Sequence, residues 1–215
     1  HILLLSVLTV LLFLPFLNKA FNIDDPLFIW SAKQISLHPF NPYGFGLNWY
    51  GVKMQGWEVI QNPPFVSYCI AFIGRLLPAS ERVLHLLFIL PSLGVVLGTY
   101  FLARRVCAKP LFAGLLVLSM PVFLVSGTSV MSDMTMLVFF VWSIVFWVRG
   151  LEREEFLSLL VASFLIGFCA LTKYYGIFLV FLLFFRCFLF LAGIFFLLRR
   201  RYAFFVLFSG PYCLC

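Results

Sequence analysis

The stretch VLHLLFILPSLGVVLGTYFLA, residues 83–103, decides the fold class of this chain. It contains no Asp, Glu, Lys or Arg, and the pair Arg104–Arg105 follows it directly. An apolar run of about 20 residues has the length of a helix that crosses the hydrocarbon core of a bilayer. The stretch therefore predicts a transmembrane helix that ends in a basic connection.

The whole chain has the composition of a membrane protein. Of its 215 residues, 64% are hydrophobic and only 11% are charged, and the mean hydropathy is +1.10. A soluble domain carries charges on about a quarter of its residues, so lipid must surround most of this chain. The net charge of +7 comes from short basic clusters between apolar runs. This pattern is typical of membrane topology and does not indicate a nucleic-acid-binding surface.

Further apolar runs on both sides of this stretch predict an all-α, polytopic bundle of transmembrane helices. We expect helices at residues 2–17, 111–126, 134–148, 156–171 and 175–198, and another that begins near Tyr202. The first residue is His1, and the sequence stops within an apolar run. We therefore expect a single transmembrane domain, residues 1–215, that forms the N-terminal part of a larger fold.

Residues 18–64 differ from the apolar runs in being rich in Asn, Gly, Pro, Trp and Tyr. Irregular polar backbone cannot face lipid, so residues 18–82 are predicted to form a long extramembrane loop. Two signals within the loop, Asp25-Pro26 and Asn62-Pro63, are typical of a helix cap followed by proline in the first turn. They predict a helix along the membrane surface and a second helix at residues 65–77.

The distribution of Lys and Arg orients the predicted helices. The short connections 104–110, 149–155 and 199–201 contain eight of the 15 basic residues, whereas the loop 18–82 contains five. Short cytoplasmic connections are enriched in Lys and Arg, so we expect these three connections on the cytoplasmic side. The long loop then lies on the extracytoplasmic side.

The same alternation places a turn around Ser132 and Asp133, and also Lys173, on the face of the long loop. The exception is Arg186, which lies midway in an apolar run that is long enough to span the membrane. Such a residue snorkels, lines a cavity or marks a break in its helix.

Two adjacent carboxylates begin the long loop. Asp24 and Asp25 follow the first apolar run by about seven residues, which places them near the bilayer surface. Because Pro26 follows Asp25, we expect Asp25 to cap the next helix. Asp24 is not needed for capping, and a carboxylate at this depth is suited to act as a general base on a hydroxyl or amine acceptor.

Three further polar positions on this face are candidate site residues. Asp133 either caps the helix at 134–148 or faces the same cavity as Asp24. Lys173 lies between two apolar runs on the side disfavoured for positive charge, so it is either a snorkelling end residue or a cation for a phosphate group. Asn62 opens a rigid proline corner that shapes the outer pocket. The lone residues His38 and His85 do not predict a metal site.

The ordered motifs resemble those of a known family. They are Asp24-Asp25-Pro26, Asn62-Pro63-Pro64-Phe65, Ser132-Asp133-Met134 and Leu171-Thr172-Lys173. Together they resemble the bacterial lipid-linked sugar transferases related to the dolichyl-phosphate-mannose protein mannosyltransferases and to the aminoarabinose transferases of lipid A. These are multi-helix membrane glycosyltransferases of the GT-C type. The chain departs from their pattern in having Asp25 where Glu is commoner and Asn62 where His is frequent.

The resemblance implies a polyprenyl-phosphate sugar donor and a lipid, glycan or protein as acceptor. It also implies a multi-pass protein of a bacterial plasma membrane whose active site faces outward. Asp24 is then the catalytic base, and Asp25, Asn62, Asp133 and Lys173 are expected to bind substrate. Whether a divalent metal joins the Asp24–Asp25 pair stays open.

A second hypothesis is a transporter or flippase subunit in which Asp133, Lys173 and Arg186 line a polar path. Transporters place ionisable groups near the bilayer midplane, and only Arg186 is expected there. The acids instead gather at one interface, which favours an enzyme. A third hypothesis, a scaffold subunit without chemistry of its own, also stays open.

Overall fold

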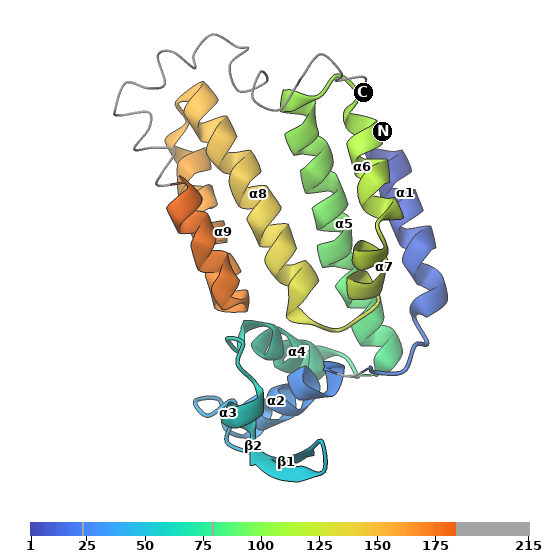
Figure 1. Ribbon diagram of the computed structural model, residues 1–215, viewed down its shortest axis with the longest axis vertical. Coiled ribbons are helices and arrows are strands. Elements are labelled where there is room, and N and C mark those ends of the chain that lie inside the picture. The colour runs from blue at the N-terminus through green and yellow to red at the C-terminus, as the bar shows by residue number, and fades with distance from the viewer. Residues whose placement is uncertain (23, 79, 184–215) are drawn as a thin grey trace.

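The computed structural model describes residues 1–22, 24–78 and 80–183. Most of them form a bundle of helices that run side by side, and residues 18–78 form a separate layer across one end of the bundle (Figure 1). We call these two parts the helix bundle and the polar layer. The predicted all-α transmembrane fold is confirmed, with the addition of one small hairpin.

The helix bundle consists of α1 (Ile2–Phe13), η1 (Leu14–Phe16), α5 (Glu81–Val106), α6 (Pro110–Ser119), α7 (Pro121–Gly127), α8 (Ser132–Arg153), α9 (Phe156–Thr172) and η2 (Tyr174–Ile177). The polar layer contains α2 (Asp25–Leu37), β1 (Gly46–Trp49), β2 (Val52–Gln55), α3 (Gly56–Val59) and α4 (Phe65–Leu76).

The bundle contains enough long apolar helices for a multi-pass membrane protein. In the described part, α5 and α8 are each long and apolar enough to cross a membrane, and α6 with α7 adds a third span if the bent pair counts as one. The helices predicted at residues 83–103, 134–148 and 156–171 are confirmed as α5, α8 and α9. The helix predicted at 175–198 is described only as far as Leu183, so Arg186 and the helix near Tyr202 lie outside the described residues.

The prediction of one continuous helix at residues 111–126 is wrong. The segment breaks into α6 and α7, which meet at an angle of 67°. Pro121 causes the break, because proline has no N–H to continue the helix and its ring forces the preceding residue out of the helical conformation. That residue, Met120, has the extended backbone angles φ −73° and ψ 123°.

Small residues allow α5 and α8 to pack closely. A Cβ atom added to Gly94 would lie 2.4 Å from Cγ2 of Val138, and one added to Gly98 would lie 2.8 Å from a methyl of Val141. Trp142 of α8 also donates from Nε1 to the carbonyl of Gly94 at 2.9 Å. Glycines four residues apart commonly bring membrane helices into such contact.

The helix directions place the basic connections 104–110 and 149–155 at the end of the bundle opposite the polar layer (Figure 1), while residues 199–201 lie outside the described residues. Ion pairs join the chain at this end. Arg105 pairs with Glu152, and Arg149 pairs with Glu155 through Nε and Oε2 at 2.9 Å. We call this the basic end of the bundle.

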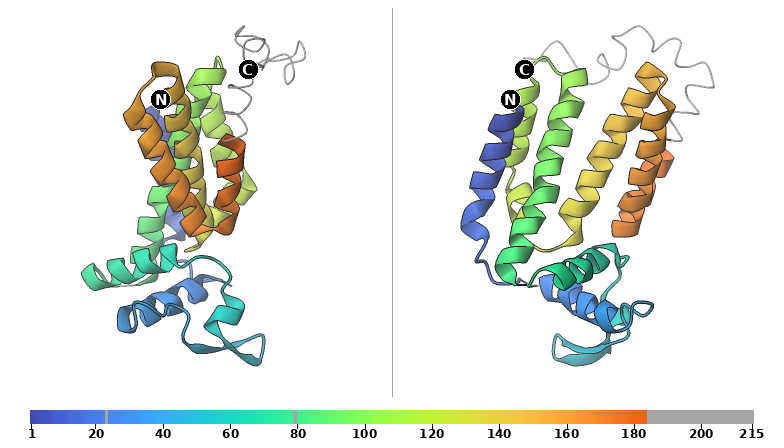
Figure 2. Two further views of the ribbon diagram at one scale, coloured as in Figure 1. Left: turned by 90° about the vertical axis from the view of Figure 1, so that its left-hand side faces the viewer. Right: turned by 180° about the vertical axis from the view of Figure 1, so that it is seen from behind.

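The polar layer packs around its two longer helices. The buried face of α2 (Phe28, Ala32 and Ile35 among others) meets Val66 and Ile70 of α4 in one apolar cluster. The helix that we predict along the membrane surface is α2, and α4 lies closer to the bundle than α2 does (Figures 1 and 2).

Residues 39–56 have no clear sequence period, yet they include an antiparallel hairpin of β1 and β2. The two residues of its turn, Tyr50 and Gly51, have φ angles of 53° and 82°. Two successive positive φ angles match the right-handed twist of a hairpin, which is why glycine is favoured there. Leu47 of β1 packs on Leu27 of α2, and this contact holds the hairpin to the layer.

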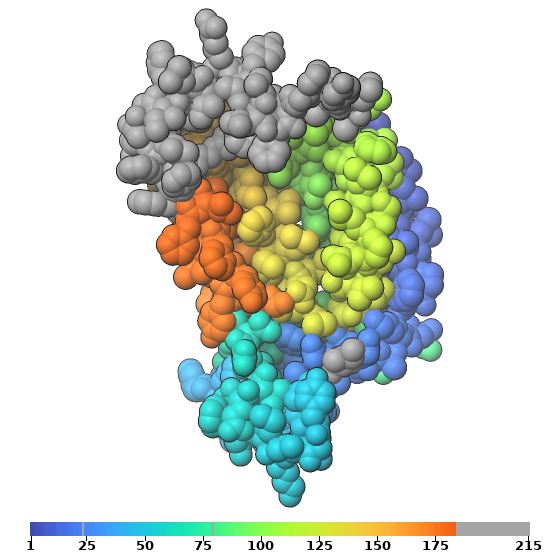
Figure 3. All heavy atoms as spheres, in the orientation of Figure 1, coloured from blue at the N-terminus to red at the C-terminus, as the bar shows by residue number. Residues whose placement is uncertain are grey.

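One face of the bundle is hollowed. In the space-filling view, α8 is set back between the α6–α7 pair and the helical segment that follows η2 (Figure 3). The hollow runs along α8 toward the end of the bundle that the polar layer covers.

Candidate functional site

The predicted site residues gather where the polar layer meets the bundle. We call this boundary the seam. It is formed by the start of α2 and the proline corner before α4 from the polar layer. From the bundle it contains the α7–α8 turn (residues 128–131), the first turn of α8 and the residues after α9.

Asp25 ties the start of α2 to the bundle. Its carboxylate is fully buried, and Oδ1 accepts a hydrogen bond from the backbone N–H of Val130 at 2.8 Å. Its Oδ2 accepts from the N–H of Asn22 at 3.0 Å. Burial raises the pKa of Asp25, while the two N–H groups and the charges of His85 and Lys19 act in the opposite direction.

The expected helix cap at Asp25 is wrong. Helix α2 begins at Asp25, so Asp24 occupies the cap position, and the Asp24 side chain makes no capping hydrogen bond. The carboxylate oxygens of Asp25 accept hydrogen bonds from the N–H groups of Asn22 and Val130 instead of from the first turn of its own helix. Sequence spacing could not reveal this, because Val130 is 105 positions away.

A second connection beside Asp25 was not predicted from the sequence. Lys19 donates from Nζ to both the carbonyl and the hydroxyl oxygen of Thr128, each at 3.1 Å. The carbonyl of Lys19 in turn accepts from Nε2 of buried His85 at 2.9 Å. His85 is therefore a structural residue, as expected for a lone histidine.

Asp24 differs from its neighbour in being partly exposed. Among the described residues, its carboxylate has no hydrogen-bond or ion-pair partner, since only its backbone carbonyl is bonded, to the N–H of Leu27. The bonds of Asp25 fix the backbone at Asp24 next to the α7–α8 turn. The result is an accessible carboxylate on a firmly attached backbone.

Asp133 and Lys173 come together across 40 residues of sequence. Nζ of Lys173 donates to Oδ1 of Asp133 at 2.6 Å, and their side chains are 19% and 36% exposed. Of the two alternatives for Asp133, the helix cap is wrong, because Met131 occupies the cap position of α8 and Asp133 lies in the first turn. The interpretation of Lys173 as a simple snorkelling residue does not account for this ion pair.

The proline corner reaches the same region. Helix α4 begins at Phe65 with Pro64 at its cap position, so the expected cap at Asn62 is wrong. The ring of Phe65 contacts Phe139 of α8 and Phe168 of α9, with centroids 5.8 and 5.4 Å away. The corner is therefore held against the two helices that carry Asp133 and lead to Lys173.

Tyr43 connects Asn62 to this region as well. Its hydroxyl donates to the backbone carbonyl of Asn62 at 2.5 Å. Burial raises the pKa of Tyr43, and the neighbouring Tyr174 and Tyr68 add to the rise. The ring contacts of Phe65 place Asn62 and the rest of the corner against the helices α8 and α9.

The Asp24–Asp25 pair does not fit a divalent cation site. The carboxylate of Asp25 is buried against two backbone N–H donors, so it is not turned toward a ligand shared with Asp24. Across residues 1–22, 24–78 and 80–183, no three His, Cys, Asp or Glu side chains group in a way that could hold a metal ion.

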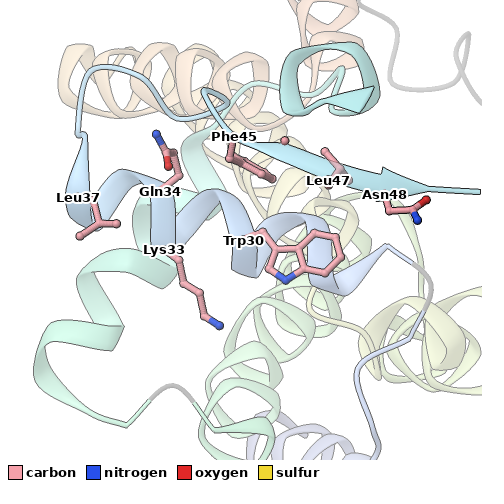
Figure 4. A pocket seen from close by; sticks show the side chains of 8 residues that line it. Trp30, Lys33, Gln34, Leu37, Phe45, Leu47 and Asn48 are labelled. Atoms are coloured by element: carbon pink, nitrogen blue, oxygen red, sulfur yellow. The ribbon is translucent and has the colours of Figure 1, made fainter. Parts of the chain in front are cut away.

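A separate cleft lies between α2 and β1 (Figure 4). Its volume is about 490 Å³, and Trp30, Gln34 and Asn48 are among the residues that line it. None of the predicted site residues lines this cleft. The cleft therefore lies apart from the predicted site residues.

The family comparison bears directly on these residues. The model of the dolichyl-phosphate-mannose-protein mannosyltransferase family matches residues 61–210, which is more than half of the chain. The chain belongs to this family. This mannosyltransferase-family protein is accordingly a membrane glycosyltransferase that uses a lipid-phosphate sugar as donor. Neither a curated protein nor a solved structure matches the chain.

The match within the mannosyltransferase family covers part of the seam. It includes Asn62, Asp133 and Lys173, whereas Asp24 and Asp25 precede it. Membership in a glycosyltransferase family favours the enzyme over the transporter hypothesis.

Proposed function

We propose that this enzyme transfers a sugar from a polyprenyl-phosphate donor to an acceptor bound at the seam, with Asp24 as the general base. One observation carries the proposal: the α7–α8 turn and the first turn of α8 link all of the charged candidates. Asp25, next to Asp24, bonds to Val130 of the turn, and Lys173 bonds to Asp133 three residues further on.

The proposed reaction is a single displacement at the anomeric carbon of the donor sugar. The Asp24 carboxylate takes the proton from the acceptor hydroxyl or amine as the acceptor atom forms a bond to that carbon. The bond between the anomeric carbon and the phosphate oxygen breaks, and its electron pair leaves with the lipid phosphate. A partly exposed carboxylate without a competing partner in the described part of the chain suits this role.

Lys173 is proposed to stabilise the leaving phosphate. Negative charge builds up on the phosphate oxygen as the bond breaks, and a fixed cation there lowers the barrier. The ion pair with Asp133 supports this role, because it holds the ammonium group in one position before the donor arrives. The side chain of Lys173 keeps some exposure, which leaves room for a phosphate.

Different roles are proposed for Asp25 and Asn62. The burial of Asp25 favours an indirect role, in which it positions Asp24. The carbonyl of Asn62 is bonded to Tyr43, so its side-chain amide is the group proposed to meet substrate.

The donor's lipid chain is proposed to lie in the hollow along α8 (Figure 3). This hollow leads toward the first turn of α8, where Asp133 lies. A chain in the hollow would bring its phosphate to Lys173 while its isoprenoid units stay among apolar side chains.

The seam is proposed to face away from the cytoplasm. The basic end of the bundle lies opposite the polar layer, and basic connections favour the cytoplasmic side. Exposed Cys107 lies at the basic end and exposed Trp57 in the polar layer, so cysteine labelling tests this directly. In intact cells, a membrane-impermeant maleimide should label a Trp57→Cys variant at that position and leave Cys107 unmodified. The reverse pattern would invert the orientation.

The base is tested by Asp24→Asn in the full-length protein. We expect sugar transfer to fall about 10²–10⁴-fold, with expression and membrane insertion unchanged, because the amide cannot accept the proton. Glu154→Gln is the matched control, since Glu154 is an exposed acid near the basic end. Full transfer activity in Asp24→Asn would contradict the assignment of the base.

A further inference from the structure

A groove between α2 and α4 lies outside the proposed reaction centre. Its volume is about 610 Å³, and none of its lining residues belongs to the α7–α8 turn, α8 or α9. Its walls are mostly apolar and include Ile29 of α2 together with Ile70 and Ala71 of α4. The groove is therefore separate from the Asp133–Lys173 pair.

Two cations from different helices line this groove. Lys33 belongs to α2 and Arg75 to α4, and both are exposed. Neither has a hydrogen-bond or ion-pair partner within the described ranges, in contrast to Lys19 and Lys173. An apolar groove with two unpaired cations is complementary to an amphiphile whose polar group is anionic.

The arrangement of the side chains of α2 also fits an amphiphile with an anionic polar group. Trp30 and Lys33 project from one side of α2, and Gln34 projects from the other (Figure 4). Trp30 and Lys33 line both the α2–β1 cleft and the groove toward α4, whereas Gln34 lines only the cleft. The groove thus pairs an indole ring with an ammonium group, a combination suited to the boundary between lipid and water.

The position of α4 indicates that the ligand comes from the bilayer. It is the polar-layer helix closer to the bundle, and its exposed residues include Phe72 at 63% and Leu76 at 68%. Large apolar side chains beside a basic residue are typical of a helix that lies in the membrane interface. An acidic peptide or a free sugar phosphate would leave these apolar walls unmatched.

We propose that the α2–α4 groove binds an anionic phospholipid of the surrounding membrane. The phosphate contacts Lys33 and Arg75, and the upper acyl chains lie against the apolar walls. Because the two cations come from different helices, one bound headgroup links α2 to α4. The lipid then stabilises the helix that carries Asp24 at its start without taking part in the reaction.

Lipid binding and thermal stability test this in the purified full-length protein. With phosphatidylglycerol in micelles of a neutral detergent, we expect a rise in the unfolding midpoint that the same amount of phosphatidylcholine does not produce. In Lys33→Gln/Arg75→Gln, we expect the apparent Kd for phosphatidylglycerol to rise about 30-fold, from the loss of two interfacial cations. Arg75→Lys should keep most of the affinity, because it retains the charge.

The matched control is Lys53→Gln/Lys109→Gln, which removes the same charge from exposed positions outside the groove. It should bind phosphatidylglycerol like the unmodified protein. Equal weakening in both double variants would overturn the proposal, as would equal protection by phosphatidylcholine or by inorganic phosphate. Tighter binding of polyprenyl phosphate than of phosphatidylglycerol at this groove would overturn the choice of occupant. The readout is binding, so it stands or falls separately from the role of Asp24.

Discussion

The helix bundle and the polar layer hold together by different means. In the bundle, apolar helices pack through small residues such as Gly94 and Gly98, and its outer surface is rich in exposed Leu, Val and Phe side chains. The polar layer has smaller apolar clusters and depends on a few specific hydrogen bonds to the bundle, above all those of Asp25 and Lys19.

This difference explains why the candidate chemistry lies at the seam. Lipid solvates the bundle surface, so an unpaired charge there would be costly. At the seam, Asp133 and Lys173 form an ion pair with each other, and Asp24 lies next to a residue that is bonded to the bundle. The seam must therefore be both firmly attached and accessible, and separate residues provide these two properties. Asp25 attaches the start of α2 to the bundle, and Asp24 stays partly exposed.

After the loss expected for Asp24→Asn, the largest effect is expected from removing the cation at the seam. Lys173→Met removes the ammonium group that is proposed to stabilise the leaving phosphate, so transfer should fall about 10²–10³-fold. Steady-state rates with a lipid-phosphate sugar donor provide the measurement. Lys109→Met is the control, because Lys109 lies at the basic end. Comparable losses in both variants would mean that Lys173 has no special role at the seam.

Removing the hydrogen bonds of Asp25 that attach the polar layer to the bundle should have the next largest effect. Asp25→Ala leaves the buried N–H of Val130 without its acceptor, at about 1–3 kcal/mol of unfolding free energy, and it also removes the bond from the N–H of exposed Asn22. Asp25→Asn keeps one acceptor oxygen and should lose less. Thermal unfolding in detergent compares the two. If Asp25→Ala and Asp25→Asn lower the unfolding midpoint by the same small amount, the hydrogen bonds of Asp25 do not hold the polar layer to the bundle.

Much of the bundle could be predicted from the sequence, because long apolar runs and basic connections state directly where helices cross a membrane. The residues 83–103 and Arg104 alone fixed the position and the end of α5 within a few residues. The broken helix at Pro121 was missed because an apolar run was given more weight than the proline within it.

The seam was only partly predictable. The sequence identified Asp24, Asp133 and Lys173 as residues of one face, but contacts across 40 or 105 positions depend on how helices fold back on each other. The caps at Asp25 and Asp133 failed for the same reason, whereas the cap at Asn62 failed because α4 begins at Phe65 with Pro64 at its cap position. Each of these two carboxylates could accept a hydrogen bond from the first turn of its own helix, but it bonds instead to a distant residue at the seam.

The close packing between α5 and α8 provides a test for the helix bundle, the other region in this comparison. Gly94→Leu places a side chain where Val138 already lies, so we expect the unfolding free energy to fall by about 1–3 kcal/mol. Gly167→Leu is the control, because a Cβ added there meets nothing within 4 Å. The measurement is thermal unfolding of the two variants, both of which keep the hydrogen bonds of Asp25 and Lys19 to the bundle. A larger loss in Gly167→Leu than in Gly94→Leu would contradict the role of the α5–α8 contact.

The smallest effect is expected at the basic end, far from the seam. Arg149 and Ser158 both donate hydrogen bonds to Glu155, and these bonds hold the pKa of Glu155 below its ordinary value of 4.5. A carboxylate with a lowered pKa adds stability above its ordinary pKa, and this stability is lost as the pH falls through the lowered value. Glu155→Gln should therefore lower the unfolding midpoint slightly at neutral pH and leave it unchanged at low pH. Because Glu155 is solvent-exposed, salt should reduce the difference further. A midpoint difference between the two proteins that grows as the pH falls below 4.5 would contradict this assignment.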